Sequence, residues 1–237
     1  MQRKSHNLFK ILFLSTTFFF TTACHSENSL QSNINKDQAQ MNAIFDIIKA
    51  NDSTLLTQHL KKFPTALESR NARHETPLMQ ALYLKRFELA KQLIQAGADV
   101  NAQDHLLNSP FLYAGAEGNT EIVKLTLQHG AKFDLYNRYG GTALIPAAEK
   151  GHLETVKLLA NTPNYPINHV NHLGWTALME AIVLSDGGET HTQIVKALLD
   201  AGADANIPDH QGITPLQHAK QRQQTAMLKL LQSHGAR

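Results

Sequence analysis

The stretch TPLMQALYLKRFELAKQLIQAGADVN, residues 76–101, is the most informative part of the chain, because both of its ends recur. The opening Thr-Pro-Leu returns, at steps of 33, 33, 34 and 38 residues, as Ser109-Pro110-Phe111, Thr142-Ala143-Leu144, Thr176-Ala177-Leu178 and Thr214-Pro215-Leu216. The closing Gly97-Ala98-Asp99-Val100-Asn101 has counterparts that begin at Gly130, Gly202 and Gly235. Two independent marks that keep one period indicate an array of repeated structural units.

Each unit predicts two consecutive helices. Thr76 suits a helix N-cap, Pro77 suits the first helical position, and Gly97 suits the left-handed position at which a helix ends. Apolar residues at helical spacing predict a narrow buried face on each helix: Leu78, Ala81 and Leu82 on the first, and Leu89, Leu93 and Ile94 on the second. One unit cannot bury both faces by itself, so neighbouring units must bury them jointly.

Small residues recur at one position of the predicted first helix, where neighbouring helices would approach closely: Ala81, Ala114, Ala147, Ala181 and Ala219. Three departures from the repeat are visible. Residues 39–71 keep the helical spacing but lack Thr-Pro-Leu, which predicts an N-terminal cap. The fourth unit has Asn161-Thr162-Pro163-Asn164-Tyr165-Pro166 in place of the second mark. The fifth carries extra residues at Ser185–His191, which fit either a functional loop or a tolerated surface insertion.

The period and the Thr-Pro-Leu mark resemble those of ankyrin repeats. Residues 151–159, GHLETVKLL, are similar to the second-helix consensus of that family. The resemblance covers residues 39–237 and implies an all-α solenoid of about six helix-turn-helix units, each with a β-turn finger. It also implies a non-enzymatic protein-binding module that needs no cofactor and acts as a monomer.

The first residues predict an export signal. Arg3, Lys4 and Lys10 precede a short apolar run at 11–20, ILFLSTTFFF, and small residues follow at 21–23. This order is typical of a secretory signal peptide, and the run is too short to span a bilayer, which needs roughly 20 residues. A buried core helix is the alternative, but the polar segment that follows offers it nothing to pack against. We therefore expect a signal peptide at residues 1–23.

Cys24, the single cysteine, directly follows the small residues. The segment resembles a bacterial lipoprotein signal, although Thr21 stands where Leu, Val or Ile is usual; cleavage by an ordinary signal peptidase is the alternative. The resemblance implies palmitate and other acyl chains on Cys24, and residues 24–38 predict a flexible tether. Because His25 rather than Asp follows Cys24, it also implies the periplasmic face of the outer membrane. Without lipidation, the protein would be periplasmic or secreted.

Charge and motifs argue against other functions. The formal charge is +2, and removal of Arg3, Lys4 and Lys10 leaves 19 basic against 20 acidic residues, which disfavours nucleic-acid binding. No nucleotide-binding or hydrolase motif occurs, so no catalytic residue is predicted. His74-Glu75 begins like a zinc-binding HExxH, but Leu78 replaces the second histidine. His105, His172 and His210 occupy the same position in their units, too far apart to share a metal ion, and no metal site is predicted.

The resemblance implies that partners bind at the fingertips and on the exposed face of the first helix. Trp175, the single tryptophan, lies at a fingertip position, and Tyr139 and Arg138 lie one unit away; Trp, Tyr and Arg dominate measured interface hot spots. The alternative is that Trp175 and Tyr139 pack against neighbouring fingers. The predicted partner-binding residues are Arg73, Tyr83, His105, Leu106, Tyr113, Arg138, Tyr139, His172, Leu173, Trp175, His210 and Gln211.

For the biological role, the family resemblance implies an inhibitor or immunity partner of a secreted toxin, or a support for a periplasmic enzyme. A secreted effector that binds proteins of another cell, with Cys24 unlipidated, is the alternative. The sequence does not identify the partner.

Overall fold

The computed structural model describes residues 38–237. The predicted signal peptide, Cys24 and all but the last residue of the predicted tether lie outside the described residues. Within the described part, residues 42–237 form one compact unit. No strand occurs among residues 38–237, so the predicted all-α class is confirmed.

The helices follow the predicted repeat in order. A helix that ends at residue 50 precedes α2 (Ser53–Lys62) and a short 3-10 helix, η1 (Pro64–Glu68). Five helix pairs follow: α3 (Pro77–Tyr83) and α4 (Phe87–Gln95), α5 (Pro110–Ala116) and α6 (Thr120–Gln128), α7 (Leu144–Glu149) and α8 (Leu153–Ala160), α9 (Ala177–Val183) and α10 (Glu189–Asp200), and α11 (Pro215–Gln221) and α12 (Thr225–Ser233). Together with the N-terminal cap these make the predicted six units.

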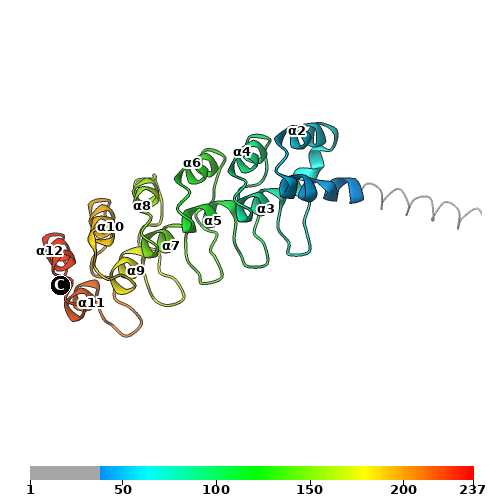
Figure 1. Ribbon diagram of the computed structural model, residues 1–237. Coiled ribbons are helices and arrows are strands. Elements are labelled where there is room, and N and C mark those ends of the chain that lie inside the picture. Colours follow the sequence, from blue (N-terminus) through cyan, green and yellow to red (C-terminus); the bar gives the residue numbers. More distant parts are fainter. Residues whose placement is uncertain (1–37) are drawn as a thin grey trace, which may run out of the picture. The chain divides into compact units, whose positions relative to one another are not determined.

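The pairs stack into two layers (Figure 1). The odd-numbered helices α3 to α11 form an inner layer, and the even-numbered helices α4 to α12 form an outer layer. The loop that joins each outer helix to the next inner helix projects beyond the inner layer, which places the predicted fingers in one row along the array.

The predicted N-caps begin four of the five inner helices. The hydroxyls of Thr76, Ser109, Thr176 and Thr214 each accept the backbone N–H three residues later, at 3.1–3.3 Å. In the fourth unit no side chain of α7 itself caps the helix, and the hydroxyl of Tyr165 accepts the Leu144 N–H at 3.1 Å instead. Burial raises the pKa of Tyr165 to about 12, so this hydroxyl stays neutral. The segment that lacks the second mark therefore supplies the missing cap.

The inner helices α3, α5, α7 and α9 are buried along most of their length, whereas α11 at the end of the array buries only Pro215 and Ala219. In α3, residues 77–82 are all buried, because α3 lies between η1 and α5 and packs against its outer partner α4. The prediction of one narrow apolar face on this helix was therefore wrong. The recurring alanines are at most 1% exposed. At Gly115 of α5 the start of α7 approaches so closely that an added Cβ would lie 2.6 Å from the Cβ of Ala143.

The outer helices keep the predicted amphipathic pattern. Leu89, Leu93 and Ile94 of α4 are at most 1% exposed, and full burial of one such side chain stabilises the fold by about 1.5–3 kcal/mol. Gly97 has a φ of +96° after α4, as its sequence position predicts. The stack is therefore stabilised by apolar helix faces that become buried only when neighbouring units pack against them.

The extra residues of the fifth unit are less irregular than the sequence suggests. Residues 189–191 belong to the start of α10, which has 12 residues where the outer helices α4, α6, α8 and α12 have eight or nine. The remaining turn is fixed by Gln224, whose side-chain amide donates to the carbonyls of Ile182 and Ser185 at 3.0 and 3.3 Å. The insertion is thus part of the packed structure. Among residues 38–237, no helix is both long and apolar enough to cross a bilayer.

Candidate protein-binding surface

An Asn or Asp side chain holds the base of each finger closed. Its Oδ1 atom accepts the backbone N–H groups two and four residues later, at 2.8–3.0 Å, in all five fingers. The residues are Asn71, Asp104, Asn137, Asn171 and Asp209. Because one side chain satisfies two loop amides, each finger is a rigid frame that presents the residues at its tip.

Neighbouring fingers are also joined through their backbones. The His105 N–H donates to the carbonyl of Arg73 at 3.4 Å, and the His172 N–H donates to the carbonyl of Tyr139 at 2.9 Å. Between these fingers, the side-chain amide of Gln103 donates to the carbonyls of Leu107 and Tyr136 at 2.6 and 2.9 Å. Rigidity of this kind lowers the ordering entropy that a binding surface loses when a partner docks.

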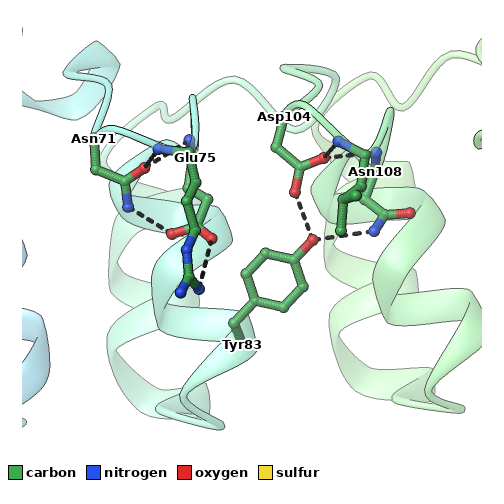
Figure 2. A network of polar contacts seen from close by, with 7 residues as sticks. Asn71, Glu75, Tyr83, Asp104 and Asn108 are labelled. Carbon is green, nitrogen blue, oxygen red and sulfur yellow. Dashed lines mark hydrogen bonds and ion pairs between the residues drawn. The ribbon is translucent and has the colours of Figure 1, made fainter.

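Two groups of polar contacts, which together form the polar network, lie at the first two fingers (Figure 2). The Tyr83 hydroxyl donates to the carboxylate of Asp104 at 2.5 Å and accepts from the side-chain amide of Asn108 at 3.0 Å. In the preceding finger, the side-chain amide of Asn71 donates to Glu75 at 2.5 Å. Burial and the hydrogen bond to the Asp104 carboxylate raise the pKa of Tyr83 well above its usual value. Glu75, Tyr83 and Asp104 line a hollow of about 550 Å³.

A second hollow, of about 240 Å³, lies between α7, α9 and the two fingers that precede these helices. Its deepest acid is Glu180, which is 5% exposed and accepts a hydrogen bond from the side-chain amide of Asn171 at 2.8 Å. Burial, and then the nearby charge of Glu149, raises the pKa of Glu180 to about 7. The sequence analysis did not single out Glu180.

Most of the predicted partner-binding residues are exposed on the row of fingers. The tips carry Arg73, His105, Leu106, Arg138, Tyr139, His172, Leu173, His210 and Gln211, all of them exposed. Tyr139 and Leu173 are each 54% exposed, which is unusual for side chains of their size. The structure therefore gathers these residues along one edge of the array.

The remaining three predicted residues are half-buried. Tyr83 and Tyr113 contact each other edge to face, with ring centroids 4.6 Å apart, and Tyr83 also belongs to the polar network. Trp175 follows its finger tip, and its backbone N–H donates to Asn171 at 3.0 Å. The rings of Tyr83 and Tyr113 are thus engaged with each other, and the backbone of Trp175 belongs to the closed base of its finger.

Arg138 and Tyr139 form a preassembled pair. The guanidinium carbon of Arg138 lies 4.7 Å from the Tyr139 ring centroid, and Arg138 donates to the Tyr139 hydroxyl at 2.9 Å. Arg73 lies 3.9 Å from a carboxylate oxygen of Glu75 on its own finger. No ring contact joins Trp175 to Tyr139 among residues 38–237. The predicted strip of Arg and aromatic residues is therefore divided between successive fingers.

Several histidines have structural contacts. The Nδ1 atoms of His129 and His234 each lie 2.8 Å from the backbone carbonyl four residues earlier, at the ends of α6 and α12. The rings of His74 and His105 lie 5.0 Å apart. Within the described part of the chain, no three His, Cys, Asp or Glu side chains are grouped so as to hold a metal ion.

Comparison with known proteins agrees with this architecture. A family model described as ankyrin repeats in three copies matches residues 111–209, and one described as ankyrin repeat matches residues 73–105. Together they match more than half of the chain. The Escherichia coli (strain K12) protein YahD, described as an ankyrin repeat protein, is 38% identical over 162 residues, which are 68% of this chain and 81% of YahD.

Two similar crystal structures cover nearly the whole array. The ankyrin repeat domain ABAYE2397 of Acinetobacter baumannii AYE has a TM-score of 0.79 and 47% identity, over 82% of this chain and 98% of that chain. The ankyrin repeat protein EF0377 has a TM-score of 0.78 and 39% identity, over 81% of this chain and 97% of that chain.

Proposed function

Because this chain belongs to the ankyrin-repeat family, we propose that it is a non-enzymatic module that holds one protein partner against its row of fingers. The ankyrin fold is typically a binding scaffold, and its repeats generally bind proteins. The observation that carries the proposal is the Arg138–Tyr139 pair, an exposed aromatic and guanidinium already in contact on a rigid finger. Residues of these types contribute most of the binding energy in protein interfaces.

Exposed leucines extend this surface on both sides of the pair. Leu106 and Leu173, on the preceding and following fingers, are 46% and 54% exposed. Apolar side chains of this size gain free energy when a partner covers them. The proposed interface therefore consists of apolar anchors on three successive fingers, with Arg138 supplying a positive charge.

The proposal extends to location. Residues 1–23 have the features of an export signal, and Cys24 is in position to become a lipid-bearing N-terminus. Several acyl chains would hold the protein stably on the outer membrane, and a tether of about 14 residues would let the repeat array reach about 20 Å from the lipid surface. Such a module would inhibit or neutralise a toxin, or support a periplasmic enzyme.

Capture from membranes tests the binding surface. The wild-type chain is used as bait beside three variants: Tyr139→Ala, Trp175→Ala and, as a control, Phe87→Ala at the start of outer helix α4. Phe87 is 39% exposed but lies away from the fingers. We expect a protein that wild type and F87A retain equally and that both finger variants lose, while circular dichroism shows all four chains folded. Equal recovery by every folded variant would exclude the fingers as the binding surface.

A second experiment tests the anchor. Incorporation of labelled palmitate into the full chain, and its loss in Cys24→Ala, is the expected result. If the protein instead carries no label and is found undegraded in the culture medium, the alternative role of a secreted effector that binds proteins of another cell is favoured.

A further inference from the structure

The hollow between α7 and α9 has a charged floor and apolar walls. Glu180 lies at the floor and Glu149 also lines the hollow, while Tyr139, Leu173 and Leu184 belong to its walls. These three wall residues are 54%, 54% and 48% exposed, so a side chain of a binding partner can contact them. A side chain with an apolar stem and a charged end matches such a lining.

Glu180 has no cation beside it in the described part of the chain. One carboxylate oxygen accepts from Asn171 at 2.8 Å, and no hydrogen bond reaches the other oxygen among residues 38–237. Lys150, which follows Glu149 in sequence, is turned away and pairs with Glu117 at 2.8 Å. A carboxylate buried to this degree is normally paired with a cation, because removal of a lone charge from water is costly.

The first hollow shows how the same array satisfies a buried acid internally. There Glu75, 7% exposed, has the guanidinium of Arg73 from its own finger at 3.9 Å. The fingertip position of Arg73 is occupied by Leu173 in the finger that precedes Glu180 and by Tyr139 in the finger before that one. Glu75 thus has a cation from its own finger, whereas the wall near Glu180 presents the Tyr139 ring, which Arg138 contacts and which stays 54% exposed.

The size of the hollow restricts its occupant. At about 240 Å³ it is smaller than the roughly 300–1,000 Å³ typical of sites for drug-sized molecules, and a single long side chain is the better match. An aromatic ring attracts a cation that lies over its face, and Tyr139 provides such a ring at the wall. Charge complementarity with Glu180 and Glu149 therefore selects a basic side chain over an apolar one.

We propose that this hollow receives one lysine or arginine side chain of the bound protein, with its aliphatic stem between Tyr139 and Leu173 and its charged end at Glu180. The inference rests on the proposed protein-binding function and specifies the chemistry of one contact. Glu149 strengthens the negative potential, and Asn171 orients the Glu180 carboxylate through its hydrogen bond.

Small model compounds test the site without the natural partner. Full-length protein with Cys24 unmodified is titrated with N-acetyl-lysine methylamide and N-acetyl-arginine methylamide, and N-acetyl-norleucine methylamide serves as the uncharged match. NMR follows the side-chain amide of Asn171 and the backbone amide of Leu173, because both residues line the hollow. We expect saturable shifts with both cationic compounds and no saturation with norleucine.

Three variants assign the effect to the proposed acid. Glu180→Gln keeps an acceptor for Asn171 and should raise the concentration of the cationic compounds at the titration midpoint at least tenfold. Glu149→Gln should raise this midpoint concentration by a smaller factor. Glu154→Gln removes an equally charged but exposed residue of outer helix α8 and should leave the midpoint unchanged. Unchanged amide spectra elsewhere show that each variant is folded.

Equal midpoints for norleucine and lysine compounds, or an unchanged midpoint in E180Q, would overturn the proposal. If capture from membranes depends on Tyr139 while the titrations show no cation preference, the protein-binding function stands and this contact is wrong. If the titrations succeed and capture depends on no finger residue, the cation site stands and the proposed binding surface is wrong.

Discussion

The hydroxyl of Tyr83 on inner helix α3 and the carboxylate of Asp104 at the base of the next finger are joined by a 2.5 Å hydrogen bond across the boundary between two repeats. Asp104 simultaneously accepts the backbone N–H groups of Leu106 and Asn108 at 2.8 and 3.0 Å. One hydroxyl therefore links the packing of an inner helix to the shape of the finger that follows it.

Tyr83→Phe should lower the free energy of unfolding by about 1–3 kcal/mol, because it leaves a buried carboxylate oxygen without its donor. The aromatic contact with Tyr113 would remain. Urea denaturation followed by circular dichroism measures the change. Tyr136→Phe is the matched control, since Tyr136 is 38% exposed and no hydrogen bond reaches its hydroxyl in the described structure, and it should cost less than about 0.5 kcal/mol.

Tyr165→Phe should destabilise the array by a similar amount, about 1–3 kcal/mol, for a different reason. The hydroxyl accepts the Leu144 N–H, a backbone donor at the start of α7, a helix that has no side-chain cap of its own. The ring would keep its contact with Phe133, whose centroid lies 5.0 Å away. Hydrogen exchange should show faster exchange at Leu144 in the variant, and an unchanged rate there would contradict the assigned cap.

Gly115→Ala tests the closeness of the inner layer. Alanine would favour the helical state of α5 by about 1 kcal/mol, but its Cβ would lie 2.6 Å from the Ala143 Cβ and 3.1 Å from the Ala143 carbonyl oxygen. Overpacking of a core typically costs 1–3 kcal/mol, and neither Ala143 atom belongs to a flexible side chain that could turn away. We expect a net loss of about 1 kcal/mol in urea denaturation. A gain in stability would show that α5 and α7 separate easily.

Glu180→Gln should stabilise the protein at neutral and alkaline pH. The folded state raises the pKa of Glu180 from 4.5 to about 7, so the folded protein holds this proton more tightly than the unfolded chain does. The contribution to stability is therefore fully present below pH 4.5, declines as the pH rises, and is lost above about pH 7. Because glutamine never ionises, E180Q should exceed wild type by about 2–3 kcal/mol above pH 7.

The pH dependence separates this effect from a simple gain in packing. The advantage of E180Q over wild type, measured by urea denaturation at several pH values, should shrink towards zero as the pH falls below 4.5, where the wild-type carboxyl becomes protonated in both states. Glu154→Gln, on the exposed surface of α8, should show no comparable trend. An advantage of constant size at every pH would contradict the assigned ionisation.

The helical framework was predictable from the sequence because its signals are local. Thr76 caps α3, Pro77 opens it, and Gly97 has the left-handed φ that a helix end requires. The extent of burial was not predictable from one unit, since the neighbours that cover Met79 and Gln80 lie a full repeat away. The same holds for Tyr165, whose hydroxyl replaces a cap 21 residues earlier in the chain.

The candidate surface was predictable only in part. Position in the repeat correctly indicated exposed tips such as Tyr139 and Leu173. The Asn and Asp residues at the finger bases recur with the same steps as Thr-Pro-Leu, and this signal could have revealed the closed frames. Glu180 gave no such signal, because the burial of its carboxylate depends on contacts between two repeats and the other inner helices have Gln80, Tyr113, Pro146 and His218 at its position.

The Asn or Asp at each finger base also has a consequence for how this protein can diversify. Since the side chain of an Asn or Asp closes each frame by accepting main-chain N–H groups, these closing bonds do not use the side chains of the tip residues. Tips such as Arg138-Tyr139 and His172-Leu173 could therefore be exchanged between fingers, or randomised in a library, while the array still folds. Substitution of a few exposed fingertip residues would therefore give this chain new binding specificities.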